Sequence, residues 1–152
     1  MNLTEVTNTI GQFQREYSAI KQKGQELIQA LNKEFTSEPM NKLINIVSAD
    51  AFLLTFNFLG KELFAQTVIL PEKPIRFKSE GALITYTKTH LGNLDKIYFT
   101  CSFDRSGNYL VENHPYLLEE FTFVYFMKLY TSVRLHVAAN DSGNEFVPLS
   151  AI

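Results

Sequence analysis

The sequence predicts a single α+β domain in which two helices cover one face of an antiparallel sheet. Heptad-spaced apolar residues run through the first 38 residues, which indicates a long helix. Several short alternating segments follow with no helical pattern between them, so these strands must pair mainly antiparallel. We therefore expect one domain over 1–152, with an N-terminal helix (1–38), a sheet (43–112), a C-terminal helix (115–139) and a tail (140–152).

The N-terminal helix has a recognisable start and end. Asn2 is a helix cap, and Glu5 stands where a capping box needs its carboxylate. Pro39 disfavours helical geometry in the residue before it, so the helix should end near residues 35–38. The apolar positions alternate steps of three and four, with Gly24 filling one position of the stripe: Leu3, Val6, Ile10, Phe13, Tyr17, Ile20, Leu27 and Leu31. Such a stripe favours packing across the chain's own sheet, while a homodimeric coiled coil or a partner helix are the alternatives.

The segment 52–58 is the clearest strand. Its large apolar residues alternate with Thr55 and Asn57, as in a strand with one buried face: Phe52, Leu54, Phe56 and Phe58. Residues 43–47 are either a first strand or the end of a linker. Residues 63–70 are apolar on both faces, which predicts a central strand covered on both sides. Residues 75–78, next to Pro74, fit an edge strand, and residues 82–88 add another.

Residues 97–111 predict a hairpin and complete a sheet of about five strands. Ile97, Phe99, Cys101 and Phe103 share one face of the first strand, and Tyr98, Thr100 and Ser102 share the other. Residues 104–108 are rich in turn-forming side chains, and Tyr109, Leu110 and Val111 form the returning strand.

The C-terminal segment predicts a second helix. Pro115 suits the first turn of a helix, and Glu119 and Glu120 would lie near its positive end. From residue 116 to about 139 the segment is apolar nearly all round. Residues 120–127 are also strongly β-prone, so a strand is the alternative there.

Composition excludes several function classes. A chain that is 45% hydrophobic and 20% charged can bury a core. The formal net charge of −2 and the scattered Lys and Arg argue against nucleic-acid binding. The N-terminus lacks the pattern of a signal peptide, and the most apolar run, 117–135, is interrupted by charges. With a single cysteine, these features predict a cytoplasmic protein that does not enter membranes.

No motif predicts catalysis or a cofactor. The sequence has no GxGxxG, P-loop, HExxH, GxSxG or CxxC pattern. Cys101 with His90 or His114 as base is conceivable as a nucleophile, but its apolar neighbours favour a core thiol. His114 with Glu112, Glu119 or Glu120 matches no metal-ligand spacing. We therefore expect no cofactor, no metal site, no catalytic residues and, on balance, no enzyme.

The two helices offer more apolar surface than one small sheet can bury. We expect part of it to contact another protein or a second copy, with the aromatic side chains of the C-terminal helix at the interface: Phe123, Tyr125, Phe126 and Tyr130. Small acidic α+β proteins of this kind include secretion chaperones and immunity proteins. The sequence thus predicts a chaperone-, immunity- or inhibitor-like interaction module. The alternative is a small-ligand-binding protein or enzyme with an apolar pocket between the sheet and the C-terminal helix.

Overall fold

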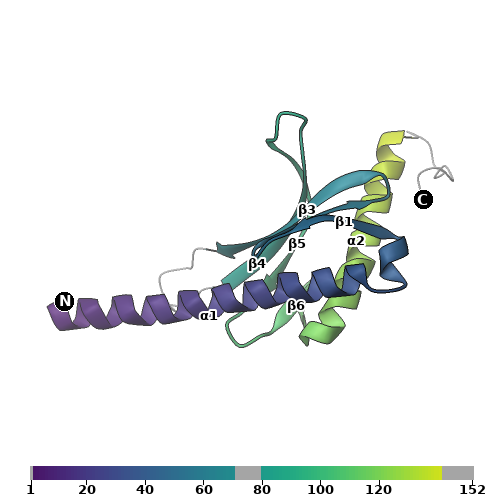
Figure 1. Cartoon of the computed structure of the whole chain (residues 1–152). Coiled ribbons are helices and arrows are strands. Elements are labelled where there is room, and N and C mark those ends of the chain that lie inside the picture. The colour runs from purple at the N-terminus through teal and green to yellow at the C-terminus, as the bar shows by residue number, and fades with distance from the viewer. Residues whose placement is uncertain (1, 71–79, 142–152) are drawn as a thin grey trace.

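The computed structural model describes residues 2–70 and 80–141, and its seven strands form one antiparallel sheet beside two helices (Figure 1). The order of strands across the sheet is their order along the chain. The strands are β1 (Ile44–Ala49), β2 (Leu53–Phe58), β3 (Lys61–Leu70), β4 (Glu80–Lys88), β5 (Leu94–Phe103), β6 (Tyr109–Val111) and β7 (His114–Tyr116). The predicted α+β class, with a long first helix and a C-terminal helix, is confirmed.

Helix α1 (Leu3–Thr36) begins with the predicted capping box. The Asn2 side chain accepts a hydrogen bond from the Glu5 backbone N–H at 2.8 Å, and the Glu5 carboxylate accepts one from the Asn2 N–H at 3.1 Å. At the other end, the Ser37 N–H donates to the Glu34 carbonyl. A single 3-10 turn (Met40–Lys42) then leads into β1. The helix is about 50 Å long at its usual rise per residue, which is more than this sheet can cover.

The core lies between the sheet and both helices. From β2, Leu54, Phe56 and Phe58 are buried, as their alternation predicts, and residues 44–49 are a strand rather than a linker. Phe35 of α1 packs edge-on against Phe56, with ring centroids 5.7 Å apart. It also lies 6.1 Å from the ring of Tyr125 on helix α2 (Leu118–Asp141). One aromatic cluster therefore joins α1, the sheet and α2.

Helix α2 shows that residues 120–127 are helical. Among its described side chains, the buried apolar ones recur every four positions and belong to the core: Phe121, Tyr125, Leu129 and Val133. The Tyr125 hydroxyl lies 2.7 Å from the buried hydroxyl of Thr85 on β4, so two polar groups satisfy each other inside the core. The β propensity of this segment is outweighed because helical spacing places four large side chains on one face.

The sequence predicts that residues 63–70 form a central strand that is covered on both faces, and the structure shows what lies on each face. Both described helices lie on one side of β3, so helices do not cover its two faces. On the other side, the rings of Phe64 and Tyr86 stack 5.5 Å apart, and the Lys88 ammonium lies 4.3 Å from the Phe64 ring. The Tyr86 hydroxyl donates to the Gln66 side chain. Neighbouring side chains thus shield one another there.

The sheet has seven strands, where the sequence predicts about five. Strand β6 is the predicted returning strand at Tyr109–Val111, and β7 is the strand that the sequence did not predict. The two are three residues each and are joined by Glu112 and Asn113, both at positive φ. Without a glycine, this two-residue turn lacks the usual hairpin signal. Pro115 lies in β7 and not in the first turn of α2, which begins at Leu118. The predicted strand at 75–78 and the tail beyond 141 lie outside the described residues.

The predicted face of β5 is wrong at one residue. Thr85 of β4 pairs with Phe99, but its neighbour Tyr86 pairs with Ile97, so Tyr98 is an extra residue on β5. This bulge turns Ile97 to the face away from the helices, where it is exposed. Phe99, Cys101 and Phe103 face the core as expected.

Candidate functional site

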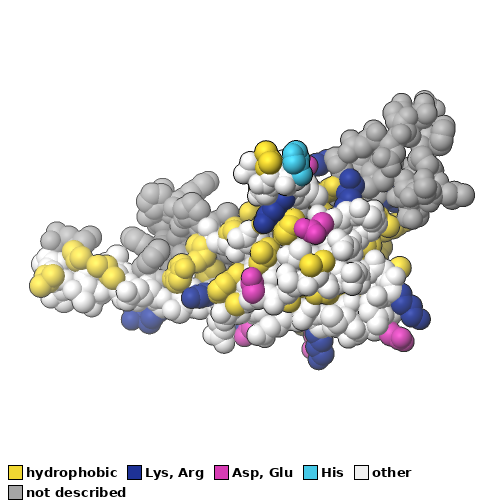
Figure 2. All heavy atoms as spheres, turned by 45° about the horizontal axis from the view of Figure 1, so that its top comes forward, with side chains coloured by type: hydrophobic (Ala, Val, Ile, Leu, Met, Phe, Trp, Pro, Cys, Tyr) yellow, Lys and Arg dark blue, Asp and Glu magenta, His cyan; other side chains and the backbone are white. Residues whose placement is uncertain are grey.

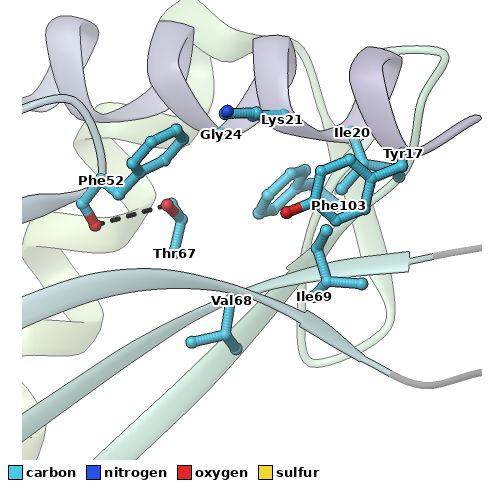
Figure 3. A pocket seen from close by; sticks show the side chains of 9 residues that line it. All are labelled: Tyr17, Ile20, Lys21, Gly24, Phe52, Thr67, Val68, Ile69 and Phe103. Atoms are coloured by element: carbon cyan, nitrogen blue, oxygen red, sulfur yellow. Dashed lines mark hydrogen bonds between the residues drawn. The ribbon is translucent and has the colours of Figure 1, made fainter. Parts of the chain in front are cut away.

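A pocket of about 310 Å³ opens between α1 and the end of β3 (Figure 3). It is lined mainly by apolar side chains: Tyr17, Ile20, Lys21, Gly24, Phe52, Thr67, Val68, Ile69 and Phe103. Strand lengths explain its position. β2 pairs with β3 only as far as Gln66, whereas β3 continues to Leu70 beside β4. Beyond Gln66 no residue of β2 fills the space beneath α1.

The back wall of the pocket is the buried ring of Phe103, which is held between two glycines. On one side Gly24 of α1 leaves room for the ring, and a Cβ built there would lie 3.4 Å from Phe103 Cζ. On the other side Gly81 of β4 is crossed by the same ring, and a Cβ there would lie only 2.2 Å from Cζ. Gly24 thus marks the place where α1 comes close to the sheet.

The side wall is formed where β2 begins. The Phe52 carbonyl accepts hydrogen bonds from the backbone N–H of Thr67 at 2.9 Å and from its hydroxyl at 3.3 Å. The Phe52 ring lies under the Lys21 ammonium, 5.5 Å from it. Phe52 therefore belongs to the apolar face of its strand as predicted, but it closes a pocket instead of filling the core.

Apolar side chains continue along α1 beyond the sheet. Among the described side chains of the helix, Ile20 is the first that is buried, and residues 3–16 extend past the sheet for about 20 Å (Figure 1). Figure 2 shows hydrophobic side chains along this projecting part. Leu3 is 81% exposed and Ile10 is 52% exposed, and Val6 and Tyr17 are exposed in the same stripe. We call these four residues the α1 stripe.

The four predicted interface residues on α2 are not brought together on one surface. Phe123 is 58% exposed, whereas Tyr125 is completely buried and has no surface to offer a partner. Phe126 is half-buried against Phe58, with ring centroids 5.9 Å apart. Tyr130 is half-buried beside the Arg134 guanidinium. Within this set, Phe123 is the side chain that a second protein can readily reach.

The predicted alternative site between the sheet and α2 is filled by side chains. Phe121, Tyr125 and Leu129 have no exposed surface there, and the Phe99 and Tyr125 rings lie 5.3 Å apart. The pocket lies beneath α1 instead. Sequence reasoning missed it because it depends on β3 being longer than β2. The available signal was Gly24, which interrupts an otherwise apolar stripe.

Candidate chemical groups are dispersed or buried. Burial raises the pKa of the Cys101 thiol to about 12, with the Lys128 ammonium acting in the opposite direction and the Glu112 carboxylate adding to the rise. His90 is exposed in the loop after β4, and His114 is exposed on β7 beside Tyr116. Among the described residues, no three His, Cys, Asp or Glu side chains are grouped to hold a metal ion. A protonated, buried thiol is a poor nucleophile.

The raised pKa values of the Cys101 thiol and the Tyr109 hydroxyl predict how the stability of the protein depends on pH. Burial raises the pKa of Tyr109 to about 12, helped by the carboxylates of Glu26 and Asp104. Above about pH 9, the unfolded chain releases protons that folded Cys101 and Tyr109 retain, so stability should fall as the pH rises towards about 12. Urea unfolding between about pH 8 and 10.5 measures this. Cys101→Ala should make the fall shallower, and a stability that rises over this range would contradict the assignment.

No helix in residues 2–70 and 80–141 combines the length and apolarity of a membrane span. Comparison of the chain with protein-family models, with curated proteins and with solved structures gives no match to any of them.

Proposed function

We propose that this protein is a non-catalytic protein-interaction module and that the α1 stripe is its main contact surface. The observation that carries this proposal is that the apolar stripe of α1 does not stop where the sheet stops. The positions that bury Ile20, Leu27 and Leu31 in the core continue outward as Ile10, Val6 and Leu3. Continuous apolar surface of this kind is typical of interfaces.

The projecting part of α1 is built to be rigid before any partner arrives. An isolated helix of this length is marginal in water because its first turn is costly to form. Here the helix is already nucleated by the turns packed on the sheet, and the capping box secures its free end. A preformed helix loses less conformational entropy on binding, so its apolar side chains contribute more to affinity.

The polar residues of the projecting part favour a protein partner over an anionic surface. Thr7 and Thr9 donate their hydroxyls to backbone carbonyls of the helix itself. The segment 3–19 contains three charged residues, Glu5, Arg15 and Glu16. Weak charge beside an apolar stripe suits a helix-in-groove or helix-on-helix contact. Chaperone-, immunity- and inhibitor-like roles all use such a contact.

Charge substitution along α1 tests the proposal. The double variant Val6→Glu/Ile10→Glu places two carboxylates in the stripe, and Asn8→Glu/Gln12→Glu adds the same charge on another side of the helix. All four side chains are exposed, so both variants should unfold at the wild-type temperature. Native mass spectrometry of tagged protein from its own host should show a protein-sized added mass with the wild type and the control. The stripe variant should lose it.

An added mass that survives Val6→Glu/Ile10→Glu unchanged would contradict the proposal. Whole multiples of the 17.4 kDa chain that the stripe variant abolishes would identify the partner as a second copy. Added mass of small-molecule size favours the second candidate function, a small-ligand-binding protein. That candidate is supported by the pocket, because about 310 Å³ falls at the lower end of the volumes of ligand sites.

A further inference from the structure

Strand β3 has an edge beside the pocket that no other described strand pairs with. The Thr67 N–H donates to the Phe52 carbonyl, which shows that the hydrogen-bonding groups of Thr67 point towards β2. Successive residues of a strand point these groups to opposite sides, and the pairing of β3 with β4 is regular from Phe64 to Leu70. The N–H and carbonyl of Ile69 therefore also point towards the β2 side. There β2 has already ended, and within the described residues no strand lies alongside.

The pocket lies directly above this edge. Thr67 and Ile69 send their side chains towards α1 as part of its lining, with Phe52 and Phe103 as walls (Figure 3). A strand added next to residues 68–70, beyond Phe52, would continue the line of β2. Every second side chain of that strand would point up into the pocket, and those between would point away from the helices. The pocket lies where these side chains would point, and its lining is mainly apolar.

The charge at the pocket suits an acidic group. Lys21 is the charged residue in the lining, and its ammonium lies over the Phe52 ring. Within the described residues no carboxylate forms an ion pair with Lys21. A carboxylate on the incoming strand would complement it.

We propose that β3 at residues 68–70, beyond the contact of Thr67 with Phe52, and the pocket above them bind an extended peptide segment by strand addition. The segment carries apolar side chains at alternate positions and an acidic residue near Lys21. Backbone hydrogen bonds to Ile69 give affinity, and the pocket gives selectivity. This inference rests on the proposed interaction function and names a second contact, which shares only Tyr17 with the α1 stripe.

The free protein allows a direct check of the edge. Hydrogen exchange followed by NMR should show a slowly exchanging Val68 amide, which faces β4, and a rapidly exchanging Ile69 amide. If the Ile69 amide is as protected as that of Val68, the edge is not open and the inference is wrong.

The binding probe is a phage-displayed library of random dodecapeptides selected on the wild-type protein, with the selected peptides then made synthetically. They should show alternate apolar residues and an acidic residue, and their binding should slow exchange of the Ile69 amide. Ile69→Pro removes the outward N–H and keeps the β4 ladder, so it should fold and yet weaken binding at least about tenfold. N-methylation of alternate peptide amides should weaken binding similarly, with no change to the protein.

Charge reversal provides a second readout. Lys21→Glu should weaken the acidic peptide several-fold and strengthen a version in which lysine replaces the acidic residue. Peptides that bind equally well to Ile69→Pro, or that leave the Ile69 amide unchanged, would overturn the inference. Failure of the library to yield any peptide that binds the wild type would also overturn it. The α1 stripe variants are measured by native mass spectrometry and not by peptide binding. A negative result for the peptide site therefore leaves the proposed function unaffected.

Discussion

Replacing Tyr125 by alanine is expected to destabilise the protein by about 3–5 kcal/mol. The ring is completely buried and packs against Phe35 of α1, Phe99 of β5 and Phe121 of its own helix. Its removal leaves a cavity where α1, α2 and the sheet meet. It also leaves the buried Thr85 hydroxyl without its partner, which adds a desolvation cost.

The matched control is two residues away on the same helix. Phe123 is 58% exposed, so Phe123→Ala should change the free energy of unfolding by no more than about 0.5 kcal/mol. Urea unfolding of both variants measures the contrast. Equal losses would show that α2 does not present Tyr125 to the core. Variants of Tyr125 lose partner binding if they unfold, so such a loss is not evidence for an interface on α2. Phe123→Asp tests that interface directly, because the Phe123 side chain is exposed.

Replacing Gly81 by alanine is expected to cost about 2–3 kcal/mol or more. The new methyl group would lie 2.2 Å from Phe103 Cζ, far inside contact distance. The ring has little freedom to move, because it is buried, stacks on Tyr109 and faces Gly24 on its other side. Strain must therefore enter β4 or the Phe103 rotamer.

Replacing Gly24 by alanine is expected to change the free energy of unfolding in the opposite direction. A methyl group there would meet Phe103 and Thr67 at 3.4 Å, which is ordinary contact, and alanine is favoured over glycine within a helix by about 1 kcal/mol. Gly24→Ala should thus be neutral or stabilise by up to about 1 kcal/mol. Chemical denaturation of the two variants distinguishes them, and a Gly81→Ala protein as stable as the wild type would show that the ring is free to relax.

The elements whose patterns are local could be predicted from the amino-acid sequence. Asn2 and Glu5 specify the start of α1, and the alternation at 52–58 specifies a strand with one buried face. The period of each pattern depends only on residues close together in the chain, because backbone geometry fixes which side chains share a face. The α+β class and the two terminal helices follow from these patterns.

Tertiary structure decided which apolar residues are buried. The stripe of α1 has the same spacing at Ile10 as at Leu27, yet only Leu27 has a sheet beneath it. Tyr125 and Phe123 look alike in sequence, but they face opposite ways once α2 is packed. The bulge at Tyr98 and the short hairpin at Glu112 likewise depend on which strand lies alongside.

The candidate site depends entirely on tertiary structure. The pocket and the edge at Ile69 exist because β2 begins only at Leu53, opposite Gln66, while β3 continues to Leu70 beside β4. No local pattern encodes a difference in length between two paired strands. It arises from register and from the path of α1 across the sheet, which are set by contacts between residues far apart in the chain.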